Sequence, residues 1–180
     1  MRIIAGTHRG TRIFAPKGMD TRPTGDRVRE AAFNLIGPVD GASVLDLFAG
    51  SGAMGLEALS RGAASAVFVE SDREACRTIE RNLAKLELGG ATVLCRDALQ
   101  ALAGDRRTYD LVLCDPPYGF AGHGRIAPYL RVALAPNGLL VYETDACSEP
   151  EIEGLTVRTS RTYGAARLTL FQAISLARDG

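Results

Sequence analysis

The sequence lacks tryptophan, and it contains only two histidines and four cysteines that lie far apart along the chain. None of the cysteines forms a C-x-x-C pair, so we expect no zinc site and instead free thiols in a reducing cytoplasm. No apolar run approaches the roughly 18–20 residues of a membrane-spanning helix. The first residues lack the apolar core and cleavage site of a signal peptide. These absences predict a cytoplasmic protein with no metal and no membrane partner.

Net charge is also absent, because 21 basic side chains balance 21 acidic ones. The distribution is nevertheless uneven. Residues 1–30 hold seven basic and three acidic side chains, a net charge of +4, and the other 150 residues hold fourteen and eighteen, a net charge of −4. A basic arm on a mildly acidic body points to a polyanionic partner, although a solvated, arginine-rich start is the simpler alternative.

The chain is long enough for one domain with a small extension. Residues 1–20 predict a basic β-hairpin, with strands at 2–5 and 11–15, and residues 21–180 predict the main domain. Residues 21–25 are expected to form a rigid linker, after which Asp26 caps a helix that ends at Ile36.

From Ser43 onward, strand patterns alternate with helix patterns. Strands are predicted at 43–47, 66–70, 92–95, 109–114 and 139–143, and helices at 52–61, 72–86, 98–103 and 125–133. Residues 156–162 and 167–173 alternate in polarity around a short turn, which predicts an antiparallel hairpin. The fold class is therefore α/β, with a doubly wound, mostly parallel seven-stranded sheet that ends in this hairpin.

The stretch Asp115-Pro116-Pro117-Tyr118 follows the fourth of these strands. Two prolines end the strand and stiffen the turn, because neither can donate to the sheet and each fixes φ. A carboxylate, two rigid carbonyls and an aromatic ring would form a platform for a planar group that carries an exocyclic amine. The alternative is a proline-closed turn in which Asp115 only caps the next segment.

A glycine pattern follows the first core strand. Gly50, Gly52 and Gly55 match G-x-G-x-x-G, and Glu70 lies eighteen residues after Gly52, as in dinucleotide-binding proteins. Asp46 weighs against a dinucleotide, because a carboxylate beside the loop would repel a pyrophosphate and favour a cationic ligand.

S-adenosylmethionine is such a ligand, since it has a sulfonium, an ammonium and no phosphate. Asp97 follows the third strand and could accept a hydrogen bond from the adenine amine of this cofactor. Any one of these acids could be a helix cap, but acids at four successive strand ends favour S-adenosylmethionine over NAD.

These motifs resemble the RsmD family of small-subunit (16S) ribosomal RNA guanine-N2 methyltransferases, within the class I S-adenosylmethionine-dependent fold. The resemblance runs nearly end to end, through residues 2–6 and 9–10, 21–24 and 26–30, 46–52 and 55–63, 115–118 and 163–164. The Asp-Pro-Pro-Tyr turn alone also marks adenine-N6 DNA methyltransferases, and the amino-terminal motifs narrow the family. Met54 stands where leucine is common, a change that keeps the volume.

The resemblance implies methylation of one guanine N2 in the helix 31 loop of 16S rRNA, on an assembled or late-assembling 30S particle, by a monomer. Implied catalytic residues are Asp115, Pro116, Pro117 and Tyr118. Implied cofactor residues are Thr24, Asp46, Phe48, Ala49, Gly50, Ser51, Gly52, Glu70, Ser71, Asp97, Ala98 and Asp115. Implied RNA-binding residues are Arg2, His8, Arg9, Arg12, Arg22, Arg27 and Arg29.

Several alternatives stay open at this point. Phe48 could be a core residue and His8 a hairpin-tip residue, and we interpret Cys114 and Glu143 as structural. An adenine-N6 methyltransferase would share the loop and the turn, but a DNA enzyme would usually need a target-recognition segment, for which 180 residues leave little room. A nucleotide-binding or RNA-binding module without enzymatic activity is the alternative from a different class.

Overall fold

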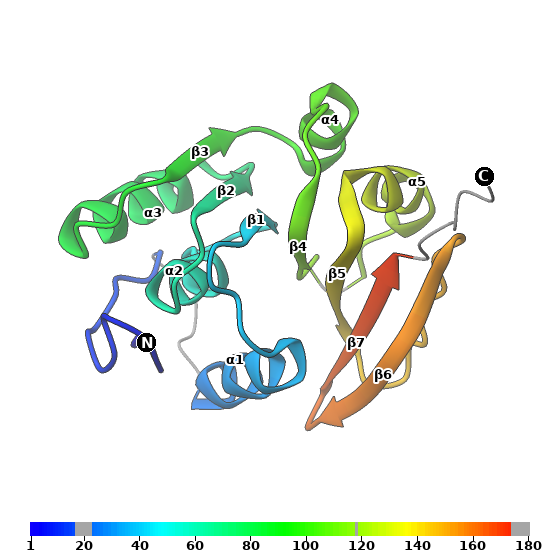
Figure 1. Cartoon of the computed structure of the whole chain (residues 1–180), viewed down its shortest axis with the longest axis horizontal. Coiled ribbons are helices and arrows are strands. Elements are labelled where there is room, and N and C mark those ends of the chain that lie inside the picture. Colours follow the sequence, from blue (N-terminus) through cyan, green and yellow to red (C-terminus); the bar gives the residue numbers. More distant parts are fainter. Residues whose placement is uncertain (17–22, 118, 174–180) are drawn as a thin grey trace.

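The computed structural model describes residues 1–16, 23–117 and 119–173. Its helices are α1 (Pro23–Ile36), α2 (Ala53–Ser60), α3 (Arg73–Lys85), α4 (Ala98–Gly104) and α5 (His123–Ala133). Its strands are β1 (Ser43–Leu47), β2 (Ser65–Glu70), β3 (Ala91–Cys95), β4 (Tyr109–Cys114), β5 (Leu134–Asp145), β6 (Leu155–Tyr163) and β7 (Ala166–Ala173). The strands form one sheet in the order β3-β2-β1-β4-β5-β7-β6 (Figure 1). β1 to β5 pair in parallel, and β7 pairs antiparallel with β5 and β6, which confirms the predicted sheet.

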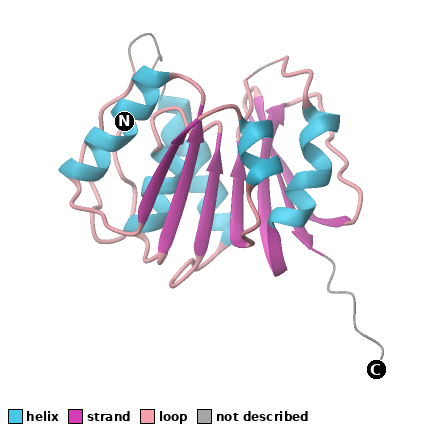
Figure 2. Cartoon of the chain, turned by 90° about the horizontal axis from the view of Figure 1, so that it is seen from above, coloured by secondary structure: helices cyan, strands magenta, loops and turns pink. Residues whose placement is uncertain are grey.

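The sheet carries helices on both faces (Figure 2). Val44 of β1 belongs to a core shared with α1, α2 and α3, whereas its neighbours Leu45 and Leu47 belong to a second core shared with α4 and α5. Successive side chains of a strand point to opposite faces, so a parallel strand covered on both faces must be apolar throughout. The continuous apolar runs of the central strands have this cause.

The strand order reverses between β1 and β4. From β1 the chain proceeds outward to β2 and β3, and it then returns to the other side of β1 to form β4 and β5. The connections diverge there, so a crevice forms beyond the carboxyl ends of β1 and β4, and open α/β sheets bind ligands at this position. The glycine-rich segment and the Asp-Pro-Pro turn both begin at these two strand ends.

The amino-terminal arm, residues 1–16, forms a looser hairpin than predicted. Its two halves share a single antiparallel bridge, between Arg2 and Arg12. The arm instead pairs with the body of the domain, where the N–H groups of Ile4 and Ala5 donate to the Glu57 carboxylate of α2, at 2.8 and 2.9 Å. Backbone groups committed to the body cannot also extend a two-stranded ladder.

α1 begins at Pro23, four residues before Arg27, the first helical residue in the prediction. Pro23 is its first residue, a position where proline is well tolerated because the first N–H groups of a helix have no intrahelical partner. Asp26 therefore lies in the first turn rather than at the cap, and it accepts a hydrogen bond from Arg29 at 3.0 Å. The predicted boundary between residues 20 and 21 lies outside the described residues. None of the described helices is long and apolar enough to cross a membrane.

Gly6 and Gly10 test how firmly the arm is seated on α2. Both have φ near +80°, but a Cβ on Gly6 would lie 1.7 Å from the Ser60 carbonyl oxygen, whereas a Cβ on Gly10 would meet nothing within 4 Å. Gly10→Ala should cost about 1–2 kcal/mol through backbone strain alone. Gly6→Ala should cost about 1–3 kcal/mol more, because the arm must leave the end of α2. Urea unfolding of both variants measures the difference, and equal losses would contradict this seating of the arm.

Candidate active site

The Asp-Pro-Pro turn lies at the point where the strand order reverses. Cys114, the residue before the turn, is in register with Leu47 of β1 and with Tyr142 of β5. The turn therefore lies between the glycine-rich loop on one side and the end of β5 on the other. Asp115 and Pro117 are exposed, and Pro116 is buried. Tyr118, the predicted stacking residue, lies outside the described residues.

Two carboxylates hold the glycine-rich loop in place. The Gly50 N–H donates to Glu70 of β2 at 2.9 Å, and the Gly55 N–H donates to Asp46 of β1, also at 2.9 Å. Phe48 has a φ of +57°, which is uncommon for a residue with a side chain, and Gly52 has a φ of +77°. The loop is thus preorganised by side chains from the two strands beside it.

Gly55 is required for the packing of α2 against the sheet. A Cβ at this position would lie 2.4 Å from a ring carbon of Phe68 on β2. The third glycine of the pattern therefore lets the helix approach the strand closely, as in dinucleotide-binding folds. The glycine pattern alone consequently does not distinguish a dinucleotide from another adenosine ligand.

Asp46 does not face the ligand as a free charge, contrary to the sequence prediction. Its carboxyl is buried, which raises its pKa to about 8; the neighbouring carboxylates of Asp115 and Glu70 add to the rise, and the bond from Gly55 opposes it. In the free protein Asp46 is therefore protonated near neutral pH, and repulsion of a pyrophosphate is weak. A different observation disfavours NAD: Asp46 already occupies the Gly55 N–H at the start of α2, where a pyrophosphate would bind.

The next strand ends carry the remaining predicted cofactor residues. Glu70, half-buried, accepts from the Asp72 N–H at 2.8 Å and from the Ser71 hydroxyl at 3.4 Å. Asp97 is exposed and caps α4 by accepting from the Gln100 N–H. The cap alternative is thus correct for Asp97, whose carboxylate also remains open to solvent.

The other predicted cofactor residues form the floor of this region. Ala49, Ser51 and Ala98 are buried. The Asn82 amide donates to the carbonyl of Ser51, which fixes the loop against α3. Thr24 lies in α1, and its side chain lies outside the described part of the chain. Within the described ranges, no group of three histidine, cysteine, aspartate or glutamate side chains is placed to hold a metal ion.

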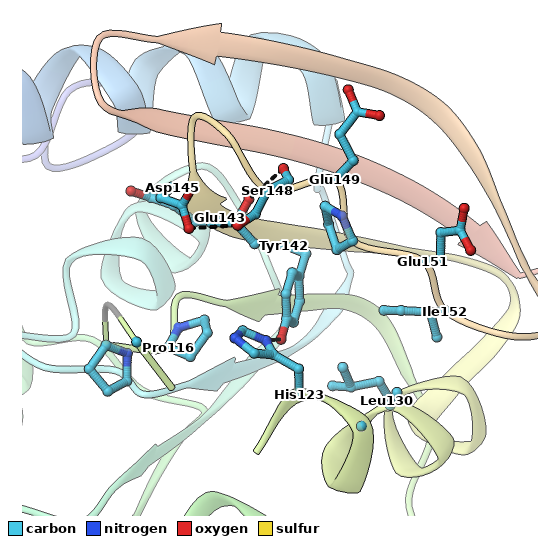
Figure 3. Close-up of a pocket in the computed structure, with 16 residues that line it drawn as sticks. Pro116, His123, Leu130, Tyr142, Glu143, Asp145, Ser148, Glu149, Glu151 and Ile152 are labelled. Atoms are coloured by element: carbon cyan, nitrogen blue, oxygen red, sulfur yellow. Dashed lines mark hydrogen bonds between the residues drawn. The ribbon is translucent and has the colours of Figure 1, made fainter. Parts of the chain in front are cut away.

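A cavity of about 250 Å³ opens on the β5 side of the turn (Figure 3). Pro116 and Pro117 form one part of its lining, and His123 of α5 and Tyr142 of β5 form another. The His123 ring nitrogen Nδ1 shares a hydrogen bond with the Tyr142 hydroxyl. Edge contacts continue from His123 through Phe120 to Phe48, which joins this wall to the glycine-rich loop. Phe48 is thus half-buried between the glycine-rich loop and the wall of the cavity.

Glu143 also lines this cavity, although we interpreted this residue as structural from the sequence. Burial raises its pKa to about 8, and the nearby Asp115 carboxylate adds to the rise. Desolvation also raises the pKa of Asp115. The sequence did offer one signal for a functional role of Glu143, since it is an acid at the end of an apolar strand. Its proximity to Asp115, however, depends on the pairing of β4 with β5.

Most of the predicted RNA-binding residues lie on the surface of the arm or beside it. Arg2, Arg9, Arg12 and Arg27 are exposed. Three of them, Arg2, Arg9 and Arg27, line a depression between the arm and α1 together with the acids Asp26 and Glu30. His8 is half-buried and shares a hydrogen bond with the Thr7 hydroxyl. Arg22 lies outside the described residues.

Arg29 was wrongly assigned to this surface. It is 3% exposed, and its guanidinium donates to the Arg2 carbonyl and to Asp26, and lies 3.6 Å from the Glu57 carboxylate. The arm covers this face of α1, so a residue that a lone helix would expose becomes buried. Arg29 therefore has a structural role.

The chain is similar to known proteins over most of its length. A family model described as "Conserved hypothetical protein 95" matches residues 1–172. The chain is 40% identical over 184 residues to "Putative rRNA methyltransferase YlbH" of Bacillus subtilis (strain 168), across 96% of this chain and 98% of that protein. It is 42% identical over 154 residues to "Ribosomal RNA small subunit methyltransferase D" of Escherichia coli (strain K12), across 85% of this chain and 76% of that protein.

A solved structure shows the same architecture. "Putative methyltransferase yhhF from Escherichia coli" matches with a TM-score of 0.86 and 35% sequence identity. The match covers 96% of this chain and 97% of that chain. The similarity therefore includes the amino-terminal arm as well as the sheet.

The raised pKa of Asp46 predicts a pH-dependent loss of stability. In the unfolded chain Asp46 ionises near pH 3.8, whereas in the folded protein it keeps its proton to about pH 8. The unfolded state therefore binds fewer protons in this window, and stability falls as the pH rises. Asp46→Asn keeps an oxygen for the Gly55 N–H and cannot ionise. Between pH 4.5 and 8, its stability relative to wild type should rise by about 1–3 kcal/mol in urea unfolding of the free protein.

The control for this measurement is Asp40→Asn, which changes an exposed carboxylate on the loop after α1. Its stability relative to wild type should be nearly independent of pH. If the Asp46→Asn difference is equally flat, the burial of Asp46 does not act on the folding equilibrium as described.

Proposed function

Because the chain belongs to the RsmD family, we propose that it transfers the methyl group of S-adenosylmethionine to the exocyclic N2 of one guanine in 16S rRNA. Family membership supports an S-adenosylmethionine-dependent methyltransferase that acts on ribosomal RNA. One observation of the site supports transfer to an amine: the rigid Asp-Pro-Pro turn lies between the glycine-rich loop and an open cavity. Its acceptors can reach a base in the cavity and face the cofactor side at the same time.

The residues around the loop fit S-adenosylmethionine. The ribose hydroxyls, the adenine amine and the cationic methionine end of this cofactor all require hydrogen-bond acceptors. The carboxylates at the strand ends are such acceptors. Glu70 would bind the ribose, Asp97 the adenine amine, and the loop backbone around Gly50 the methionine end. Thr24, Asp46, Phe48, Ala49, Ser51, Gly52, Ser71, Ala98 and Asp115 complete the proposed binding set. When bound, this cofactor supplies an electrophilic methyl group on its sulfonium sulfur.

The protein's own contribution is to prepare the amine. The lone pair of an exocyclic nitrogen is delocalised into the base, which makes the amine a poor nucleophile. The Asp115 carboxylate and the Pro116 carbonyl would accept its two N–H bonds and so turn the lone pair toward the methyl group. Pro116 and Pro117 hold these acceptors rigidly, and fixed positions lower the entropic part of the barrier. Tyr118 would stack on the base, a contact worth about 1–3 kcal/mol.

The arm is proposed to bind the RNA backbone. Three exposed arginines of the arm would contact phosphates: Arg2, Arg9 and Arg12. Arg27 on α1 and Arg22, which precedes α1 in the sequence, would do the same. Such contacts are independent of sequence, so the arm would set affinity while the cavity sets the target. We further propose that the target lies in the helix 31 loop of 16S rRNA, on an assembled or late-assembling 30S particle, and that the protein acts as a monomer.

Methyl incorporation from labelled S-adenosylmethionine tests the activity and the target. Substrates are small subunits without native methylation, naked 16S rRNA and duplex DNA, followed by nucleoside analysis. We expect N2-methylguanosine, with more on subunits than on naked RNA. N6-methyladenine, in DNA or RNA, would instead show that the same turn acts on adenine. Binding of cofactor without any transfer would contradict the proposed function.

Asp115→Ala tests the role of the turn in the same reaction. Loss of one of the two acceptors should lower kcat by about 10²–10⁴-fold, with cofactor affinity changed much less. Asp40→Ala, which removes an exposed carboxylate far from the turn in the sequence, is the matched control and should keep wild-type activity. Retention of most activity by Asp115→Ala would remove Asp115 from the mechanism.

The salt dependence of RNA binding tests the arm. Each phosphate contact that is lost should lower the slope of log K against log salt concentration by about 0.7–0.9. Arg9→Gln and Arg12→Gln should each weaken binding to 16S rRNA by this route. Arg158→Gln on β6 removes an equal charge outside the arm and is the control. Slopes that match the control would show that the arm does not contact the RNA backbone.

A further inference from the structure

The cavity beside the Asp-Pro-Pro turn is lined by acids and lacks lysine and arginine among its described lining residues. Glu143, Asp145, Glu149 and Glu151 all contribute to the lining. Glu149 is paired with Arg167 at 3.3 Å, and Asp145 accepts from the Ser148 hydroxyl and the Cys147 N–H. A phosphate would be repelled from this lining, whereas a neutral group that is rich in hydrogen-bond donors would be favoured.

Among the acids of the cavity lining, Glu143 follows the strand position that is paired with the residue before the turn. It follows Tyr142, which is in register with Cys114, just as Asp115 follows Cys114. The two acids therefore lie at the ends of neighbouring strands, and neighbouring strands are about 4.8 Å apart. The Asp115 carboxylate lies close enough to Glu143 to contribute to its raised pKa. The Glu143 carboxyl makes no hydrogen bond or ion pair to another described residue, in contrast to Asp145 and Glu149.

Two side-by-side carboxyls match one edge of one base. On its Watson–Crick edge guanine presents two adjacent donors, the N1–H and the N2 amine. Adenine presents an amine beside an unprotonated N1, and cytosine presents an amine beside an unprotonated N3. An ionised carboxylate only accepts, so it fits a second donor and is left unpaired against an acceptor. Burial raises the pKa of Glu143 to about 8 and the Asp115 carboxylate adds to the rise, so two donors from a guanine would favour the ionised, accepting form of Glu143.

We infer that Glu143 selects guanine, by accepting the N1–H of the base whose N2 amine is held by Asp115 and the Pro116 carbonyl. This inference rests on the proposed function and adds its specificity determinant. The catalytic turn then recognises an exocyclic amine, and Glu143 recognises the atom next to it. The cavity of about 250 Å³ holds the base between the prolines of the turn and the His123–Tyr142 wall (Figure 3).

A base analogue that keeps the amine but lacks the N1 proton separates these two roles. 2-Aminopurine keeps the N2 amine but has an unprotonated N1 and no O6. Small subunits are assembled with 16S rRNA that carries guanine or 2-aminopurine at the position that the wild-type protein methylates. Wild type should prefer guanine by roughly 10–100-fold in kcat/KM, the discrimination expected of one such pair of contacts.

Glu143→Gln is the decisive variant, because its amide N–H can donate to the unprotonated N1 of 2-aminopurine. The preference for guanine should fall at least tenfold, through a slower reaction with guanine and a faster one with 2-aminopurine. Glu153→Gln removes an exposed acid that does not line the cavity and should keep the wild-type preference. Because each ratio compares two substrates on one protein, a general loss of stability or of intrinsic reactivity cancels.

Three outcomes would overturn the inference. A folded Glu143→Gln protein with the wild-type preference would show that Glu143 does not contact N1. Equal methylation of both substrates by wild type would also show that N1 is not contacted, and this outcome does not depend on whether the variant folds. Absence of any transfer by wild type to the guanine N2 would reject the proposed function itself, which distinguishes that failure from the failure of Glu143 as a specificity residue.

Discussion

The buried carboxylate of Glu57 holds together the amino-terminal arm, α1 and α2, and the proposed activity requires these parts to stay in contact. Glu57 lies in α2, is 0% exposed, and accepts hydrogen bonds from the backbone of Ile4 and Ala5 and from Arg61. Arg29 of α1 completes the cluster at 3.6 Å. A carboxylate without these partners would cost several kcal/mol to bury, so the arm, α1 and α2 depend on one another. The first turn of the same helix contains Gly55 of the glycine pattern, so the arm is anchored close to the proposed cofactor site.

The acids at the carboxyl edge of the sheet divide into two groups. Asp46, Glu70 and Asp97 each accept a backbone N–H bond and hold the loops and helix starts in place. Asp115 and Glu143 instead lie at the neighbouring ends of β4 and β5, Glu143 in the cavity lining, and each has a raised pKa. The first group fixes the frame with bonds inside the protein, and the second leaves acceptors for a substrate. One edge of the sheet can therefore serve both cofactor and base.

Local signals predicted the fold well. The strands and helices from Ser43 onward were found within two residues, except that β5 begins at Leu134, five residues before its predicted start. Two further errors have different causes. Arg29 was assigned to the solvent and is buried by the arm, which the sequence around it cannot show. The start of α1 at Pro23, which moved Asp26 from the cap into the first turn, had a local signal, because proline is common at the first helical position.

By itself the sequence determined the strand and helix pattern, the glycine-rich loop and the stiff Asp-Pro-Pro turn. These depend on the backbone freedom of glycine, the fixed φ of proline and the spacing of apolar residues, all of which act within a few positions. Only the tertiary structure decided that Glu143 lies beside Asp115, since 28 positions separate them in the chain and the pairing of β4 with β5 unites them. Burial likewise raises the pKa of Asp46, so that this carboxyl supports the loop rather than presenting a free charge. The pKa depends on the atoms that replace water around the carboxyl, and those atoms come from the whole fold.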